Sequence, residues 1–86
     1  MARLWPEGEP VGVQCNGEDL PVAFTWRGRG HRLAQIVQRW RVDADWWSVE
    51  GRVHRDYWAV TTTSGLLCVL YRDLDKESWF LAKVYD

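Results

Sequence analysis

Hydrophobic residues alternate with polar ones in short runs along this chain, and turn residues separate the runs. The clearest run spans residues 20–26, where Leu20, Val22, Phe24 and Trp26 would share one side of an extended strand. Runs of this length between glycine, proline and asparagine are typical of short strands joined by turns. The pattern therefore predicts a mainly β protein, a small twisted antiparallel sheet or partly closed barrel of about six strands.

Turn residues divide the rest of the chain into further runs of this kind. The Asn16-Gly17 pair tolerates a positive φ at both positions, so we expect Val11–Cys15 to pair antiparallel with the run after the turn. Residues 56–63, 66–74 and 79–86 predict a meander of three strands. The last two runs are apolar on both faces, which predicts that they are sandwiched, covered by a loop or in contact with a partner.

Residues 31–42 fit two different structures. A helical spacing is met by four apolar residues, Leu33, Ile36, Val37 and Trp40. A strand with a bulge near Val37 would instead group Ala34, Ile36, Trp40 and Val42. We favour the strand, because the neighbouring runs are strands and no helix N-cap precedes the segment. Residues 43–53 then predict a loop or a single short helical turn.

Tryptophan is unusually abundant, with seven residues in 86. Alternation places Trp26 and Trp58 in the core, and we expect Trp40 there as well. The adjacent pair Trp46 and Trp47 is different, because neighbouring residues of a strand cannot both fill one core. Two interpretations stay open: the pair plugs the open end of the barrel, or it presents an exposed platform to a partner.

Charge is distributed unevenly although the net charge is only −1, which argues against a strongly electrostatic nucleic-acid binder. Residues 1–26 carry a net −3, residues 27–55 a net +4 and residues 56–86 a net −2. Every cation of the central segment is arginine, which binds phosphates and carboxylates with two parallel hydrogen bonds and stacks on aromatic rings.

Arginines and aromatic residues are interleaved in this basic centre. Single-stranded nucleic acid is held by the same two chemistries, cations along the backbone and aromatic faces for the bases. The alternative is that the arginines are solvated strand edges that pair with the acidic flanks. The candidate binding residues are Arg27, Arg29, Arg39, Arg41, Trp46, Trp47, Arg52, Arg55 and Tyr57.

The sequence gives little support for a metal site or a catalytic site. The spacings of Cys15, His31, His54 and Cys68 match no zinc pattern, and both cysteines are expected to be buried reduced thiols. His54 and Asp56 would share a strand face, but such a pair is far more often structural than catalytic. We therefore predict a protein that is not an enzyme and has no metal and no cofactor.

Length and hydropathy predict a single domain over residues 1–86. The first residues lack the apolar core of a signal peptide, and no apolar run approaches the roughly 18 residues that cross a bilayer. With only two cysteines, a disulfide scaffold is not expected. We expect a cytoplasmic protein that does not associate with membranes.

Several short motifs lie along about Phe24 to Asp86: Phe24-x-Trp26-x-Gly28-Arg29, Trp40, Trp46-Trp47, Arg55-x-Tyr57-Trp58, Leu70-Tyr71-Arg72-Asp73 and the ending Trp79-x-Leu81-x-x-Val84-Tyr85-Asp86. Together these motifs resemble DUF6504, a family of small bacterial domains of unknown function. The second half of the chain is also similar to the C-terminal tail region of the catalytically inactive Y-family polymerase homologue of bacterial mutagenic repair cassettes.

The resemblance implies an accessory module of error-prone translesion DNA synthesis without polymerase chemistry of its own. The expected partner is a Y-family polymerase or another repair protein, or single-stranded DNA, bound through the arginine and tryptophan residues. The rival hypothesis is a purely structural barrel that forms a homodimer through its two-sided apolar C-terminal strands. The least favoured alternative is a hydrolase that uses His54 and Asp56.

Overall fold

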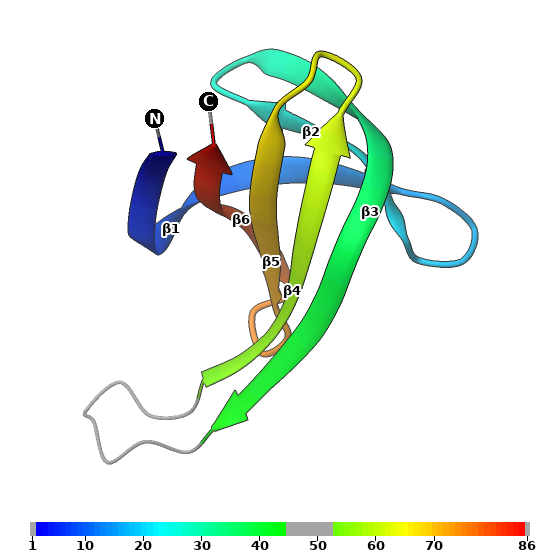
Figure 1. Cartoon of the computed structure of the whole chain (residues 1–86). Helices are drawn as coiled ribbons and strands as arrows, with labels where there is room; N and C mark the ends of the chain where they lie inside the picture. The colour runs from blue at the N-terminus through cyan, green and yellow to red at the C-terminus, as the bar shows by residue number, and fades with distance from the viewer. Residues whose placement is uncertain (1, 45–52, 86) are drawn as a thin grey trace.

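Six antiparallel strands form a closed barrel in the order β1-β2-β3-β4-β5-β6 (Figure 1). The structure, a computed structural model, describes residues 2–44 and 53–85. Each strand pairs with the next in sequence, and β6 closes the barrel on β1. The predicted mainly β class is confirmed, and no helix occurs within these ranges. The strands are β1 (Ala2–Cys15), β2 (Pro21–Trp26), β3 (Arg29–Ala44), β4 (Val53–Thr62), β5 (Leu67–Asp73) and β6 (Ser78–Tyr85).

A membrane-spanning helix is likewise not found in the described part of the chain.

The barrel interior is filled by apolar side chains from β2, β4, β5 and β6. On β4 the alternation is unbroken, so that Trp58, Val60 and Thr62 are buried while the residues between them face outward. The most completely buried core residues are Phe24, Trp58, Val60, Cys68, Leu70, Leu81 and Val84.

The ambiguous segment forms a strand, β3, rather than a helix. Its register against β4 shifts twice, at Ala34 and at Val37, and the second shift confirms the bulge predicted there. A bulge inserts one residue and reverses which side chains face inward after it. Arg39 therefore lies opposite the inward Trp58, and Trp40 lies opposite the outward Tyr57. The prediction that Trp40 belongs to the core is wrong for this reason.

A similar irregularity exposes Val22. β1 pairs Gln14 with Ala23 but Cys15 with Pro21, so Val22 is an extra residue in β2. Its side chain is 40% exposed, whereas alternation alone would place it with Phe24. Alternation thus predicted the inward position of Phe24 correctly and that of Val22 wrongly.

The connection from β1 to β2 is longer than the predicted tight turn. The residue with positive φ is Asp19 (63°), whereas neither Asn16 nor Gly17 adopts it. The Asn16 side-chain oxygen accepts hydrogen bonds from the backbone N–H groups of Glu18 and Leu20 at 2.9 and 3.1 Å. The predicted antiparallel pairing of the two strands is confirmed.

Cys15 ends β1 with its side chain exposed, whereas Cys68 is fully buried in the core. The expectation that both thiols are buried is therefore wrong for Cys15, which lies where the β1–β2 pairing becomes irregular. Partial burial, followed by the negative charge of Asp19, raises the pKa of the Cys15 thiol.

Candidate interaction surfaces

A ladder of aromatic side chains crosses the outer face of the sheet from β3 to β6. Each residue lies opposite the next in the strand register. Successive ring centroids are 5.3, 5.3 and 5.0 Å apart, within the range of favourable aromatic pairs. The ladder therefore joins four strands through their outward side chains. Its members are Trp40, Tyr57, Tyr71 and Phe80.

The N-terminal half of β1 covers one end of this aromatic ladder. Its Gly8 backbone is so close that an added Cβ would lie 2.5 Å from the Tyr71 hydroxyl oxygen and 2.7 Å from Cβ of Phe80. Tyr71 is consequently only 2% exposed although it faces outward. This contact explains in part why β5 and β6 are apolar on both faces: one face packs in the core, and β1 covers the other face at Tyr71 and Phe80.

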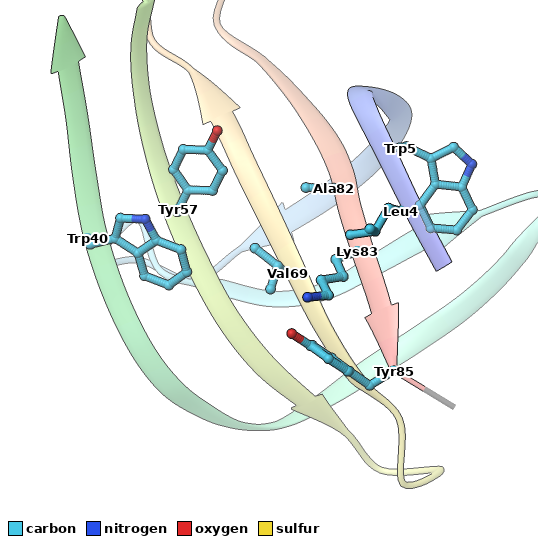
Figure 2. Close-up of a pocket in the computed structure, with 8 residues that line it drawn as sticks. All are labelled: Leu4, Trp5, Trp40, Tyr57, Val69, Ala82, Lys83 and Tyr85. Carbon is cyan, nitrogen blue, oxygen red and sulfur yellow. The ribbon is translucent and has the colours of Figure 1, made fainter. Parts of the chain in front are cut away.

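The uncovered part of the outer face forms a groove of about 460 Å³. Figure 2 shows Leu4 and Trp5 of β1 on one side of it and Trp40 and Tyr57 on the other. Leu4 is 65% exposed, an unusual position for a leucine beside other apolar side chains. The outer groove is lined by Leu4, Trp5, Trp40, Tyr57, Val69, Ala82, Lys83 and Tyr85.

Lys83 is the single charged side chain among these lining residues. Its Nζ atom lies 4.4 Å from the centre of the Tyr85 ring, a cation–π contact between two residues of the groove. Arg55 lies nearby on the same face, where it donates a hydrogen bond to the Tyr57 hydroxyl (3.2 Å) and stacks 4.4 Å from the Tyr71 ring centre. The outer face is thus apolar and aromatic, with Lys83 and Arg55 as its cations.

A second surface, on the inner side of β3 and β4, holds Arg39 and Arg41 around a buried carboxylate. Arg41 donates from Nε to Asp56 Oδ1 at 2.7 Å and from its terminal nitrogen to Oδ2 at 3.2 Å. Arg39 lies 3.8 Å from the same carboxylate and 4.2 Å from the Trp58 ring centre. The hydrogen bonds from Arg41 and the charges of both arginines hold the pKa of Asp56 below its usual range, against the effect of burial.

A third cluster lies at the two-residue turn between β2 and β3, where Arg27 and Gly28 both have positive φ (53° and 75°). The Trp26 indole N–H donates to Glu9 at 2.8 Å, and Arg27 Nε donates to the same carboxylate at 3.3 Å. The Trp26 hydrogen bond is the main cause that lowers the pKa of Glu9. Arg29, the other arginine predicted here, is exposed at the start of β3.

Those predicted binding residues that the structure describes therefore do not form one surface. Arg27 and Arg29 lie at the β2–β3 turn, Arg39 and Arg41 on the inner side of β3, and the remaining two described residues on the outer face of β4. Trp46, Trp47 and Arg52 lie outside the described residues. Both interpretations of the tryptophan pair, a plug at the open end of the barrel and a platform for a partner, therefore stay predictions. The two outer-face residues are Arg55 and Tyr57.

The outer groove itself was not predicted as a site. Its residues come from β1, β3, β4, β5 and β6, and no motif links them. The available signal was the two-sided apolar pattern of β5 and β6, which indicated that something covers their outer face. The sequence did not show that β1 covers only part of it.

The candidate acid–base pair does not form. His54 Nδ1 lies 3.4 Å from Asp75 and its Nε2 lies 3.8 Å from Asp43, whereas Asp56 is occupied by the arginines. Within residues 2–44 and 53–85, no group of three or more histidine, cysteine and acidic side chains could hold a metal ion.

Comparison with known proteins identifies the family of this chain. Residues 6–86 match the family described as a domain of unknown function, DUF6504. Neither a curated protein nor a solved structure matches the chain. The match covers nearly the whole barrel, including the aromatic ladder and most of the strand that covers it, and the protein therefore belongs to the DUF6504 family.

Proposed function

We propose that this protein is a non-enzymatic interaction module whose outer groove binds apolar side chains of a partner protein. The observation that carries the proposal is the groove itself, about 460 Å³ beside an aromatic ladder and an exposed leucine. Concave apolar surfaces with a few polar groups at the margin are typical binding sites. Aromatic side chains held rigid by stacking bind at a low entropic cost.

The arrangement of the arginines favours a protein over single-stranded DNA as the partner. Arg27 pairs with Glu9, Arg41 with Asp56 and Arg72 with Asp19 (3.0 Å). To bind a nucleic-acid backbone, a protein needs several cations in a row that can displace the counterions of the phosphates. Cations that already face carboxylates and lie on separate surfaces fulfil this requirement poorly.

The class of partner that we propose follows from the resemblance to the inactive Y-family polymerase homologue. A Y-family polymerase or another protein of bacterial translesion synthesis would present the apolar segment, and binding would occur in the cytoplasm. Co-elution of this protein with the purified Y-family polymerase homologue in gel filtration tests this class of partner directly.

The groove is tested by changing its floor without changing the fold. Val69 faces outward on β5 opposite Lys83, so Val69→Glu places a carboxylate in the groove beside a lysine. Val22→Glu is the matched control, because it changes an exposed valine on β2. We expect short peptides selected from a random library to be rich in aromatic and aliphatic residues and to bind Val69→Glu at least about tenfold more weakly by fluorescence anisotropy.

Binding to Val22→Glu is expected to stay within about twofold of the unchanged protein, because surface substitutions away from a contact have small effects. Equal thermal midpoints of the two variants exclude loss of the fold as the cause. Peptides that bind Val69→Glu as tightly as the unchanged protein would show that the groove is not the site.

A further inference from the structure

The C-terminal half of β3 has a neighbouring strand on one side only. β2 pairs with β3 as far as Arg32, whereas β4 accompanies β3 from Leu33 to Ala44. Figure 1 shows β3 and β4 continuing together as a long ribbon. In the part of the chain that the structure describes, no strand pairs with the other edge of β3 beyond Arg32. A strand edge of this kind offers unpaired backbone N–H and C=O groups to another chain.

The regular part of this edge is short and well defined. Register shifts at Ala34 and Val37 interrupt the first part of β3, and bulges impede the addition of a strand. Residues Gln38–Asp43, in contrast, pair one to one with β4. Six residues match the usual length of a strand. We name this stretch the β3 edge.

On the inner side of the β3 edge, Arg39 is positioned to bind an incoming carboxylate. Its side chain is 52% exposed, and its guanidinium is held against the Trp58 ring at 4.2 Å. Asp56 lies 3.8 Å away, too far for a hydrogen bond, because that carboxylate accepts its hydrogen bonds from Arg41. Arg39 therefore keeps its N–H donors available, and stacking reduces the entropy that it would lose on binding.

On the outer side of the same edge, Trp40 lies between Arg39 and Arg41 and lines the outer groove. A strand added next to β3 would alternate its side chains between these two surroundings. An acidic side chain would face Arg39, and apolar side chains would face Trp40. The two faces thus specify an added strand in which acidic and apolar residues alternate.

Two copies of this chain could pair at the β3 edge in more than one antiparallel register. Centred on Trp40, the pairing would place Arg39 of each directly opposite Arg41 of the other, and like charges opposite one another are destabilising. Centred on Val42, it would place Arg41 of each opposite Asp43 of the other, so sedimentation decides between a second copy and a partner segment. The strands that the homodimer hypothesis relied on have no free edge, because β5 and β6 each have a neighbour on both edges.

We propose that the β3 edge accepts an extended segment of a partner protein as an additional strand, with an acidic residue of the segment facing Arg39 and apolar residues facing Trp40. This inference rests on the proposed function, since it names the chemistry of the partner and its mode of binding. Main-chain hydrogen bonds would provide the affinity and the alternating side chains the specificity.

The test uses a blocked peptide of about eight residues that alternates glutamate with valine or tyrosine. Amide hydrogen exchange of the ¹⁵N-labelled full chain, measured by NMR, is expected to slow at least about tenfold for those amides of residues 38–42 that do not bond to β4. The same peptide with N-methyl groups on alternate residues keeps its side chains but cannot pair, and we expect it not to bind. Arg39→Gln should weaken binding about tenfold, whereas Arg32→Gln, at an exposed arginine of β3 outside the β3 edge, should leave it unchanged.

Failure of this inference and failure of the proposed function give different results. If library peptides lose affinity for Val69→Glu but do not protect the β3 amides, the groove binds protein and strand addition is refuted. Strand addition is also refuted if the N-methylated peptide binds as tightly as the unmethylated peptide. It is refuted as well if sedimentation at micromolar concentration shows a dimer and hydrogen exchange shows that its β3 amides are protected without peptide. If neither library peptides nor the alternating peptide bind, both proposals fail.

Discussion

At the scale of single residues, Gly8 decides how β1 lies across the barrel. Its φ is +76°, and a Cβ at this position would overlap the Tyr71 ring and Cβ of Phe80. Gly8→Ala is expected to lower the free energy of unfolding by about 2–4 kcal/mol, because backbone strain and overpacking add. Urea denaturation followed by tryptophan fluorescence measures the change.

Gly12→Ala on the same strand is the control for Gly8→Ala. An added Cβ there meets no atom within 4 Å, so we expect a change within about 0.5 kcal/mol. Equal effects of the two substitutions would contradict the close packing of β1 on the aromatic ladder. The comparison also tests the groove, since the same half of β1 supplies Leu4 and Trp5 as its wall.

At the scale of elements, Asp56 joins β3 to β4 through its two arginines. Its pKa is lowered in the folded state, so its stabilising effect is present above the ordinary carboxyl pKa of about 3.9 and is lost as the pH falls through the lowered value. We expect Asp56→Asn to cost about 1–2 kcal/mol at pH 7, because the arginines are half exposed and solvent screens the pair.

The difference in unfolding free energy between Asp56→Asn and the unchanged protein should therefore narrow as the pH is lowered from 7 to 3. Urea denaturation at each pH measures this difference, and Glu18→Gln, at an exposed residue of the β1–β2 connection, serves as the control. A difference that stays constant over this range would mean that the charge of Asp56 does not stabilise the β3–β4 pair.

The elements also show how far the sequence could predict the fold. Where alternation is unbroken, as on β4, it predicted the inward residues correctly. One inserted residue reverses the pattern, and this happened at Val22 and again at Val37, which turned Trp40 from the core to the groove. The first half of β1 was missed because its proline and glycine residues read as turns, although its closeness to the aromatic ladder requires Gly8.

At the scale of the whole molecule, closure of the barrel decides which side chains meet. The arginines are close together in the sequence, and two interpretations followed from this proximity: one basic binding surface, or solvated strand edges that pair with the acidic flanks. The reversal at Val37 places Arg39 and Arg41 on the opposite side of the sheet from Arg55, and the β2–β3 turn holds Arg27 elsewhere. The candidate site could not be predicted from spacing, because it depends on bulges and on which strands become neighbours.

This distribution of charge leads to a prediction about nucleic acid. The net charge is −1, Arg27, Arg41 and Arg72 are paired with carboxylates, and the other described arginines lie on separate surfaces, so we expect a labelled thymidine oligonucleotide to bind with a Kd weaker than about 100 μM at 150 mM salt. Its affinity should change little with salt, because few phosphate contacts would release counterions, at roughly 0.7 ions each for single strands. Titration at two salt concentrations, with Arg39→Gln beside the unchanged protein, measures both quantities. Micromolar affinity that falls steeply with salt and depends on Arg39 would instead identify the inner side of β3 as a nucleic-acid surface.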